Sequence, residues 1–383
     1  MESWSSMAVN NYLIHYFKGS GFCNILMELE TALASSYITG RTLIIPNVTH
    51  QCGVTHAKST PKGSIWEVLD LAAIEKNFNV EIVDRDFITL DQYKNYYNIN
   101  DSELNTEFLA ENISNVYSVC FYNQKNITNL IDFQNFHSNR NIHNLNKQEK
   151  FLAVSHGGHF FYNVYPGTAP FRNELKNKIN SAIKFKKQYL DLADAIQKKY
   201  LKDYDAIHVR HATFFNPYKN PSIIILDIIN YPHKFKEQID KLYEKDRCIY
   251  MATDLHKAGL LYDPPKKFDI TSYKKLVRQD HNLVMLDDLN YQLSPTEEIA
   301  MELLLCTGSK KFYGTFYSTF SKRINIFRGI GGKQVTDYMG WNLIQDAWME
   351  PTTVLPWAKL KHGWEWYYSS YPQWTYEDDY LPS

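Results

Sequence analysis

Apolar residues recur along the chain in short runs, and the spacing within each run predicts alternating strands and helices. The first run predicts a strand at residues 11–17, and a helix follows with apolar residues at helical spacing from Phe22 to Tyr37. Gly40 is expected to end this helix, and residues 41–46 are predicted to form a second strand. The chain therefore opens as strand, glycine turn, helix and strand, an order typical of α/β domains.

The remaining apolar runs continue this alternation. Further strands are predicted at residues 79–82, 87–90, 151–154, 205–210, 248–254, 283–286 and 311–313. Helices are predicted at residues 64–71, 235–242 and 296–306, with a long region of one or two helices at 171–201. Strands that alternate with helices in this way indicate a mostly parallel sheet.

Two local features refine the predicted helices. The segment Ser294-Pro295-Thr296-Glu297 combines a capping box with a proline at the first helical position, so a helix is expected to begin there. That helix is apolar on nearly all sides and is expected to be buried. In the first helix, Glu28 and Glu30 are expected at the surface.

The length of the chain predicts two domains, because 383 residues are enough for two separate cores. The turn-rich segment 166–170 marks the predicted boundary. We predict an N-terminal α/β domain at 1–168, a C-terminal domain at 169–340, and a Trp-rich tail at 341–383 that packs back across both.

The composition limits the classes of partner. Hydrophobic residues make up 44% of the chain and charged residues 22%, and the formal net charge of −1 argues against a nucleic-acid partner held by broad electrostatics. No apolar run is long enough to cross a membrane, and no signal-peptide core is present at the N-terminus. Five cysteines without close spacing give neither a metal signature nor a disulfide framework. We expect a cytoplasmic protein, or the lumenal part of a secretory-pathway enzyme whose anchor was trimmed away.

Polar residues follow three of the predicted strands and form the candidate site. Arg210 ends one strand, Asp254 ends another, and Ser318 and Thr319 precede a helix after a third. An Arg binds phosphate oxygens with two parallel hydrogen bonds, and hydroxyls at a helix N-terminus favour an anion. A carboxylate suits the two donors of guanine, so the set indicates a guanine nucleotide, without a P-loop. The alternatives are a structural ion pair for Arg210 and an ordinary Ser N-cap.

Two further patterns contain residues of the types that bind metal ions. Asp84-Arg85-Asp86 is a D-x-D triplet, a pattern that can bind a divalent cation through its carboxylates. His156 and His159 stand three residues apart in a glycine-containing loop with no third ligand nearby. A single short pattern of either kind arises readily by chance, so no metal site is predicted from these residues.

Four stretches, in this order, resemble the superfamily of GDP-fucose-dependent fucosyltransferases, which includes the protein O-, the α1,6- and the nodulation fucosyltransferases. They are Gly21-Phe22-Cys23-Asn24 with the strand at 41–46, His208-Val209-Arg210 as an HxR motif, Tyr250-Met251-Ala252-Thr253-Asp254, and Gly314-Thr315 with Ser318-Thr319-Phe320-Ser321. The likeness covers the N-terminus and residues 200–325. It implies an α/β fold of the GT-B class, with two Rossmann-like domains and a cleft between them.

The resemblance also implies a function and roles for individual residues. It implies an inverting, metal-independent transfer of fucose from GDP-fucose to a glycan or protein hydroxyl, with no cofactor. Arg210 would stabilise the departing diphosphate, and Asn24 would lie near the fucose and the acceptor. The donor-binding residues would be Gly21, Phe22, His208, Arg210, Ala252, Thr253, Asp254, Ser318, Thr319 and Phe320.

The resemblance leaves the catalytic base unassigned. Some members place a Glu in the N-terminal glycine turn, where this chain has Cys23 and Asn24. A carboxylate from residues 84–115 or a base-free mechanism are both open. Two other functions are retained as alternatives: the same fold with another nucleotide-sugar donor, and a non-catalytic glycan-binding protein.

Overall fold

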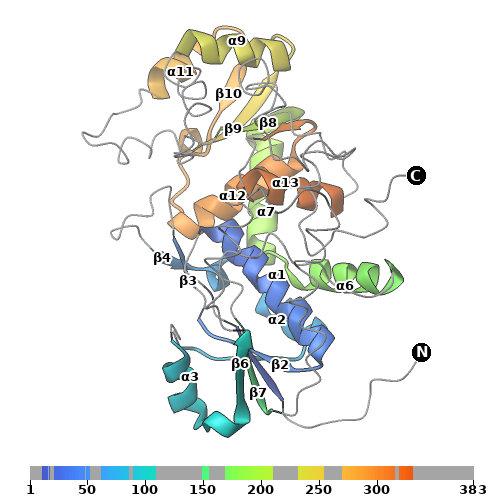
Figure 1. Ribbon diagram of the computed structural model, residues 1–383. Coiled ribbons are helices and arrows are strands. Elements are labelled where there is room, and N and C mark those ends of the chain that lie inside the picture. The colour runs from blue at the N-terminus through green and yellow to red at the C-terminus, as the bar shows by residue number, and fades with distance from the viewer. Residues whose placement is uncertain are drawn as a thin grey trace, which may run out of the picture.

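The structure is a computed structural model of the chain. It describes residues 11–15, 17, 21–47, 49–51, 62–85, 89–108, 149–154, 169–209, 232–253, 270–314 and 319–330. These residues form two parallel sheets, a short antiparallel pair of strands, and the helices that cover them (Figure 1). The α/β class with parallel sheets, predicted from the alternation of apolar runs, is confirmed.

The first sheet comes from the N-terminal part of the chain and has the strand order β5-β2-β1-β7-β6, with every pair parallel. Its strands are β1 (Tyr12–His15), β2 (Thr42–Ile45), β5 (Val80–Ile82), β6 (Leu104–Phe108) and β7 (Phe151–Val154). The connecting elements are α1 (Phe22–Thr39), β3 (Thr49–Gln51), β4 (Lys62–Ser64), η1 (Ile65–Glu67), α2 (Leu71–Asn77), α3 (Leu90–Tyr97) and η2 (Asp101–Glu103). Leu13 packs in the core cluster with α1, whereas Ile14 packs with Tyr93 of α3, so the two helices cover opposite faces.

The second sheet has the strand order β10-β9-β8-β11 and is also parallel throughout. Its strands are β8 (Tyr204–Val209), β9 (Cys248–Thr253), β10 (Asn282–Val284) and β11 (Phe312–Tyr313). The helices that follow β7 in the chain are α6 (Ala169–Ala182), α7 (Lys187–Ile196), the π-helix η5 (Gln197–Leu201), α9 (Pro232–Leu242), α11 (Ile270–Val277), η7 (Leu286–Leu289), α12 (Pro295–Gly308) and α13 (Thr319–Ile330). Of these, α6 packs against α1 and α2. All six residues of β8 are buried, as expected of a strand covered on both faces.

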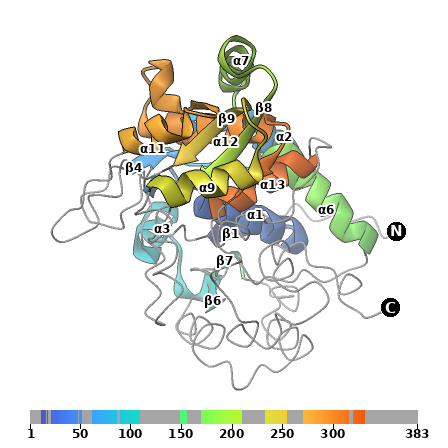
Figure 2. The same ribbon diagram turned by 90° about the horizontal axis from the view of Figure 1, so that it is seen from above.

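The helix α1 is the packing centre of the described part of the chain. It contacts β2 of the first sheet, and also α6 and α13 (Figures 1 and 2). One continuous hydrophobic cluster joins its apolar residues to those of α12 on the second sheet. Because protein surrounds α1, Glu28 and Glu30 are each only 1% exposed, and the prediction that they lie at the surface is wrong.

Most predicted elements are present, and the differences have local causes. The long region at 171–201 forms two helices and a π-helical turn. The prediction of a strand at 87–90 is wrong for its last two residues, because Thr89 caps α3 and Leu90 is the first residue of that helix. There the Thr89 hydroxyl accepts from the Gln92 backbone N–H, and Gln92 accepts from Thr89 in return. The helix predicted at 64–71 is a short 3₁₀ turn, after which Asp70 caps α2.

The capping box predicted at the start of α12 is confirmed. Ser294 Oγ accepts from the Glu297 backbone N–H, and Glu297 Oε2 accepts from the Ser294 backbone N–H at 2.8 Å. Tyr189 of α7 donates to the other oxygen of Glu297 at 2.7 Å, which ties α7 to α12. The Ser294 N–H, and after it the Tyr189 hydroxyl, hold the pKa of Glu297 below its usual value.

We predict that Glu297→Gln makes unfolding less sensitive to acid. A carboxyl group with a lowered folded-state pKa stabilises the fold fully above its unfolded-state pKa, about 4.3 for Glu, and this contribution is lost as the pH falls through the folded-state value. Urea unfolding of both proteins between pH 3 and pH 6 measures how steeply the free energy of unfolding falls with decreasing pH. An equally steep fall in Glu297→Gln would contradict the prediction.

Candidate functional site

The carboxyl ends of β8, β9 and β11 meet at one edge of the second sheet. Val209 at the end of β8 is in register with Thr253 at the end of β9, and Tyr313 of β11 is in register with Ile207. Because these strands are parallel, the segments that follow them leave from the same edge. Three predicted site residues, Arg210, Asp254 and Ser318, lie in those segments and outside the described residues.

His208, near the end of β8, is fixed by the start of α13. It is 6% exposed, and its Nδ1 lies 2.7 Å from the hydroxyl oxygen of Ser321. The ring of Phe320 lies against the imidazole, with 4.7 Å between centroids and a tilt of 39°. The hydrogen bond engages one ring nitrogen and fixes the orientation of the imidazole at the end of β8. Two of the predicted motifs, at 208–210 and 318–321, are thus in direct contact.

The close approach of α13 to β11 explains Gly314. A Cβ added at this position would lie 2.7 Å from the Cβ of Ser321 and 2.9 Å from its hydroxyl oxygen. Any side chain at Gly314 would therefore displace Ser321 and disturb its contact with His208. Packing within the protein is therefore enough to explain the glycine at this position, whether or not a ligand binds nearby.

Two further predicted residues, Ala252 and Thr253, are engaged within the fold. The side chain of Ala252 is fully buried in the main hydrophobic cluster. The hydroxyl of Thr253 is buried and donates to the backbone carbonyl of Val209 at 2.6 Å. This bond joins the last residues of β8 and β9. It therefore aligns the two strand ends, which Arg210 and Asp254 follow in the sequence.

The glycine turn of the first motif forms the start of α1. Gly21 is the N-cap residue, with an extended backbone and no side-chain cap, and Phe22 and Cys23 are buried. Asn24 is partly buried, and its Oδ1 has no hydrogen-bond partner within the described ranges. The helix that carries Asn24 packs against α13, which carries Thr319 at its first position and Phe320 at its second.

Gly21 and Gly40, at the two ends of α1, differ in whether an alanine could take their place. Gly21 has φ −61° and a Cβ there would meet no atom within 4 Å, so Gly21→Ala is expected to leave the free energy of unfolding unchanged. Gly40 has φ 65°, so Gly40→Ala is expected to cost about 1 kcal/mol. Urea unfolding of the matched pair measures both. Equal losses in the two variants would contradict the prediction.

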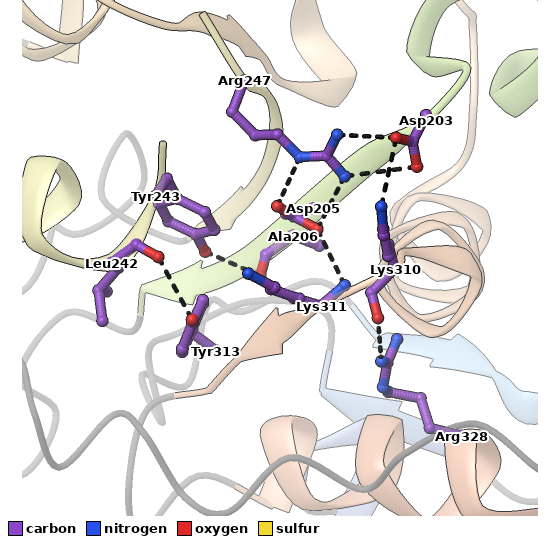
Figure 3. A network of polar contacts seen from close by, with 10 residues as sticks. All are labelled: Asp203, Asp205, Ala206, Leu242, Tyr243, Arg247, Lys310, Lys311, Tyr313 and Arg328. Carbon is purple, nitrogen blue, oxygen red and sulfur yellow. Dashed lines mark hydrogen bonds and ion pairs between the residues drawn. The ribbon is translucent and has the colours of Figure 1, made fainter. Parts of the chain in front are cut away.

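The opposite edge of the second sheet carries a structural network of charges (Figure 3). Asp205 of β8 is 2% exposed and accepts from Arg247 Nε at 2.7 Å and from the Lys311 backbone N–H at 3.0 Å. Arg247 also pairs with Asp203 at 2.8 Å, and these carboxylates hold the pKa of Arg247 above its usual value. Strand β8 therefore has a structural Asp at its amino end and a candidate ligand-binding His at its carboxyl end.

Residues considered for a metal do not form a site in the part that is described. No three His, Cys, Asp or Glu side chains within those ranges gather closely enough to hold an ion. Asp84 is exposed, whereas Asp86, His156 and His159 lie outside the described residues. Among the described helices, none combines the length and the apolar character needed to span a membrane.

Sequence reasoning missed an ion pair between the two parts of the chain. Arg323, in the second turn of α13, pairs with Glu30 of α1. Its signal was present in the sequence, because α1 is apolar on most sides and such a helix is buried all round. A charged residue on a helix of that kind has to meet an opposite charge inside the protein.

Comparison with solved structures gives fucosyltransferases as similar folds. The crystal structure of POFUT1 in complex with GDP matches with a TM-score of 0.46 and 12% identity, over 84% of this chain and 96% of that one. The fucosyltransferase NodZ from Bradyrhizobium matches with a TM-score of 0.43 and 11% identity, over 83% and 93% of the two chains. Both TM-scores lie below 0.5, and the strand orders of the two parallel sheets define the α/β fold of this chain. No protein-family model and no curated protein sequence matches the chain.

Proposed function

We propose that this chain is an inverting, metal-independent glycosyltransferase of the GT-B class, which moves fucose from GDP-fucose to a hydroxyl group of a glycan or glycoprotein. The observation that carries the proposal is the contact between His208 and Ser321, 113 residues apart in the sequence. It joins the HxR motif to the last hydroxyl-rich motif. The register of β8 with β9 supports it further, since it aligns the strand ends that precede Arg210 and Asp254.

In this proposal the second sheet holds the donor. Arg210 follows β8 directly and supplies the charge for the β-phosphate, and Asp254 follows β9 and accepts from the two donors of guanine. Ser318 and the first backbone N–H groups of α13 complete the phosphate site, because a helix N-terminus favours an anion. His208 contacts the nucleotide in the orientation that its hydrogen bond to Ser321 fixes.

The proposed chemistry needs a stable leaving group. As the bond from fucose to the diphosphate breaks, positive charge develops on the sugar ring and negative charge on GDP. A fixed guanidinium at the diphosphate binds this charge more strongly in the transition state than in the ground state. An acceptor hydroxyl attacks from the opposite side of the ring, which inverts the configuration. We place Asn24 and Gly21 beside the fucose, on the helix that packs against α13.

Calorimetry with GDP, followed by hydrolysis assays with a panel of nucleotide sugars, tests the proposal. Ser321→Ala is expected to weaken GDP binding about fivefold, because it removes the bond that orients His208, worth about 1 kcal/mol. Ser181→Ala, which removes an exposed hydroxyl on α6, is the matched control and should bind GDP normally. Absence of GDP binding by the native chain would overturn the proposal. Faster hydrolysis of another nucleotide sugar would correct the donor, and binding without hydrolysis or transfer would favour a glycan-binding protein.

A further inference from the structure

The packing of α1 against α13 contains a buried ion pair between two distant parts of the sequence. Arg323 Nη1 lies 2.5 Å from Glu30 Oε1, and the two side chains are 1% and 2% exposed. The residues are 293 positions apart in the sequence. One helix belongs to the first sheet's half and the other follows the last strand of the second sheet, so the pair connects the two.

The surroundings of the pair are apolar. Leu29 and Leu33 of α1 and Ile324 of α13 are fully buried in the same hydrophobic cluster, and Arg323 also lies over the ring of Phe327 at 5.5 Å. Apolar burial is non-directional, so contacts of this kind specify the position of one helix along the other less sharply than a charged pair does.

The pair is poorly suited to a role in stability alone. Two charges removed from water recover their desolvation cost only where further hydrogen bonds satisfy them. Glu30 Oε2 has no hydrogen-bond partner in the described portion of the chain. Buried ionic pairs of this kind are best attested as determinants of register.

We propose that Glu30 and Arg323 form a register pair that fixes the position of α13 along α1. The proposal rests on the proposed function for its catalytic consequence. Arg323 lies two residues after Ser321, and Glu30 lies six residues after Asn24 on the same helix. The pair therefore sets the distance between the helix start that orients His208 and the helix start that carries Asn24. Both are positioning residues, since neither reaches the end of its helix where the ligand would bind.

The double variant Glu30→Leu/Arg323→Met separates register from stability. Replacing a buried pair by apolar residues of similar size is often neutral or stabilising, so the melting temperature is expected to be retained. GDP is expected to bind more weakly but still measurably, because the start of α13 orients His208 while the strand ends of the second sheet are unchanged. Turnover with GDP-fucose is expected to fall by about 100-fold, the order of loss that follows a misplacement of about 1 Å.

Glu30→Asp provides a second variant, which keeps both charges and shortens the acidic side chain by one methylene group. It is expected to fold and bind GDP, and to lose turnover by about tenfold through the same shift of α13. Lys187→Gln/Asp191→Asn is the matched control, since it removes an exposed ion pair of 2.6 Å on α7. This control is expected to match the native chain in every measurement.

Hydrogen exchange gives a readout that does not depend on activity. In the double variant, peptides from α13 are expected to exchange faster than in the native chain, while those from α9, on the other face of the second sheet, are unchanged. Native exchange in α13 together with native turnover in both variants would overturn the register proposal. Failure of the native chain to bind GDP would overturn the proposed function instead, and the exchange experiment would still decide the register of α13.

Discussion

Replacing Arg210 with Ala is expected to lower turnover with GDP-fucose by about 100-fold or more while the fold survives. Arg210 follows Val209, the last residue of β8, at the edge where β9 and β11 also end. A guanidinium there would neutralise the charge that develops on the departing diphosphate. A loss of 100-fold corresponds to about 2.7 kcal/mol of transition-state stabilisation, which is the usual effect of removing one electrostatic group of this kind.

The measurement is the initial rate of donor hydrolysis and transfer at saturating GDP-fucose, with circular dichroism as the test of folding. Arg85→Ala serves as the matched control, because Arg85 is an exposed residue that lies over the ring of Tyr96 on the first sheet's half. Arg210→Lys should retain part of the rate, since an ammonium keeps the charge but loses the two parallel hydrogen bonds. Turnover near the native rate in Arg210→Ala would remove this residue from the mechanism.

Much of the fold could be predicted because local signals and tertiary packing agree. The apolar spacing from Phe22 to Tyr37 and the glycine at 40 define α1, and Gly40 does adopt the left-handed conformation that ends a helix. The capping box at Ser294 defines the start of α12 for the same reason. The parallel arrangement of β8, β9 and β11 followed from their alternation with helices, and it predicted a common edge for the polar residues that come next.

Other features depend on contacts that no local pattern specifies. The region of α3 is polar apart from a few residues, of which Tyr93 is fully buried, so apolar spacing gave no helical signal there. Ser321 was expected to be one of several hydroxyls in a turn, and only the approach of α13 to β11 selects it as the partner of His208. Glu30 was placed at the surface because its partner, Arg323, lies 293 residues away.

Arg328→Met is expected to destabilise the fold by about 3 kcal/mol. Arg328 of α13 is fully buried, and it donates from Nη1 to the Ser309 carbonyl at 2.8 Å and from Nη2 to the Lys310 carbonyl at 2.9 Å. These carbonyls follow the end of α12, where the helix dipole favours a cation. Figure 3 shows the bond to Lys310 beside the network around Asp205. Met fills much of the same volume but donates nothing, so the buried Ser309 carbonyl and the part-buried Lys310 carbonyl lose this donor.

Urea unfolding of Arg328→Met, with Lys198→Met as the control, tests this expectation. Lys198 is 76% exposed and pairs with Asp194 at 2.6 Å, so its replacement is expected to change the free energy of unfolding by less than about 0.5 kcal/mol. Burial lowers the pKa of Arg328, yet an Arg remains charged at any pH at which the protein is folded. The stabilisation by Arg328 is therefore expected to be independent of pH between 5 and 9. If Arg328→Met lowers the free energy of unfolding as little as Lys198→Met does, the Ser309 and Lys310 carbonyls do not need the guanidinium as a donor, and the prediction is wrong.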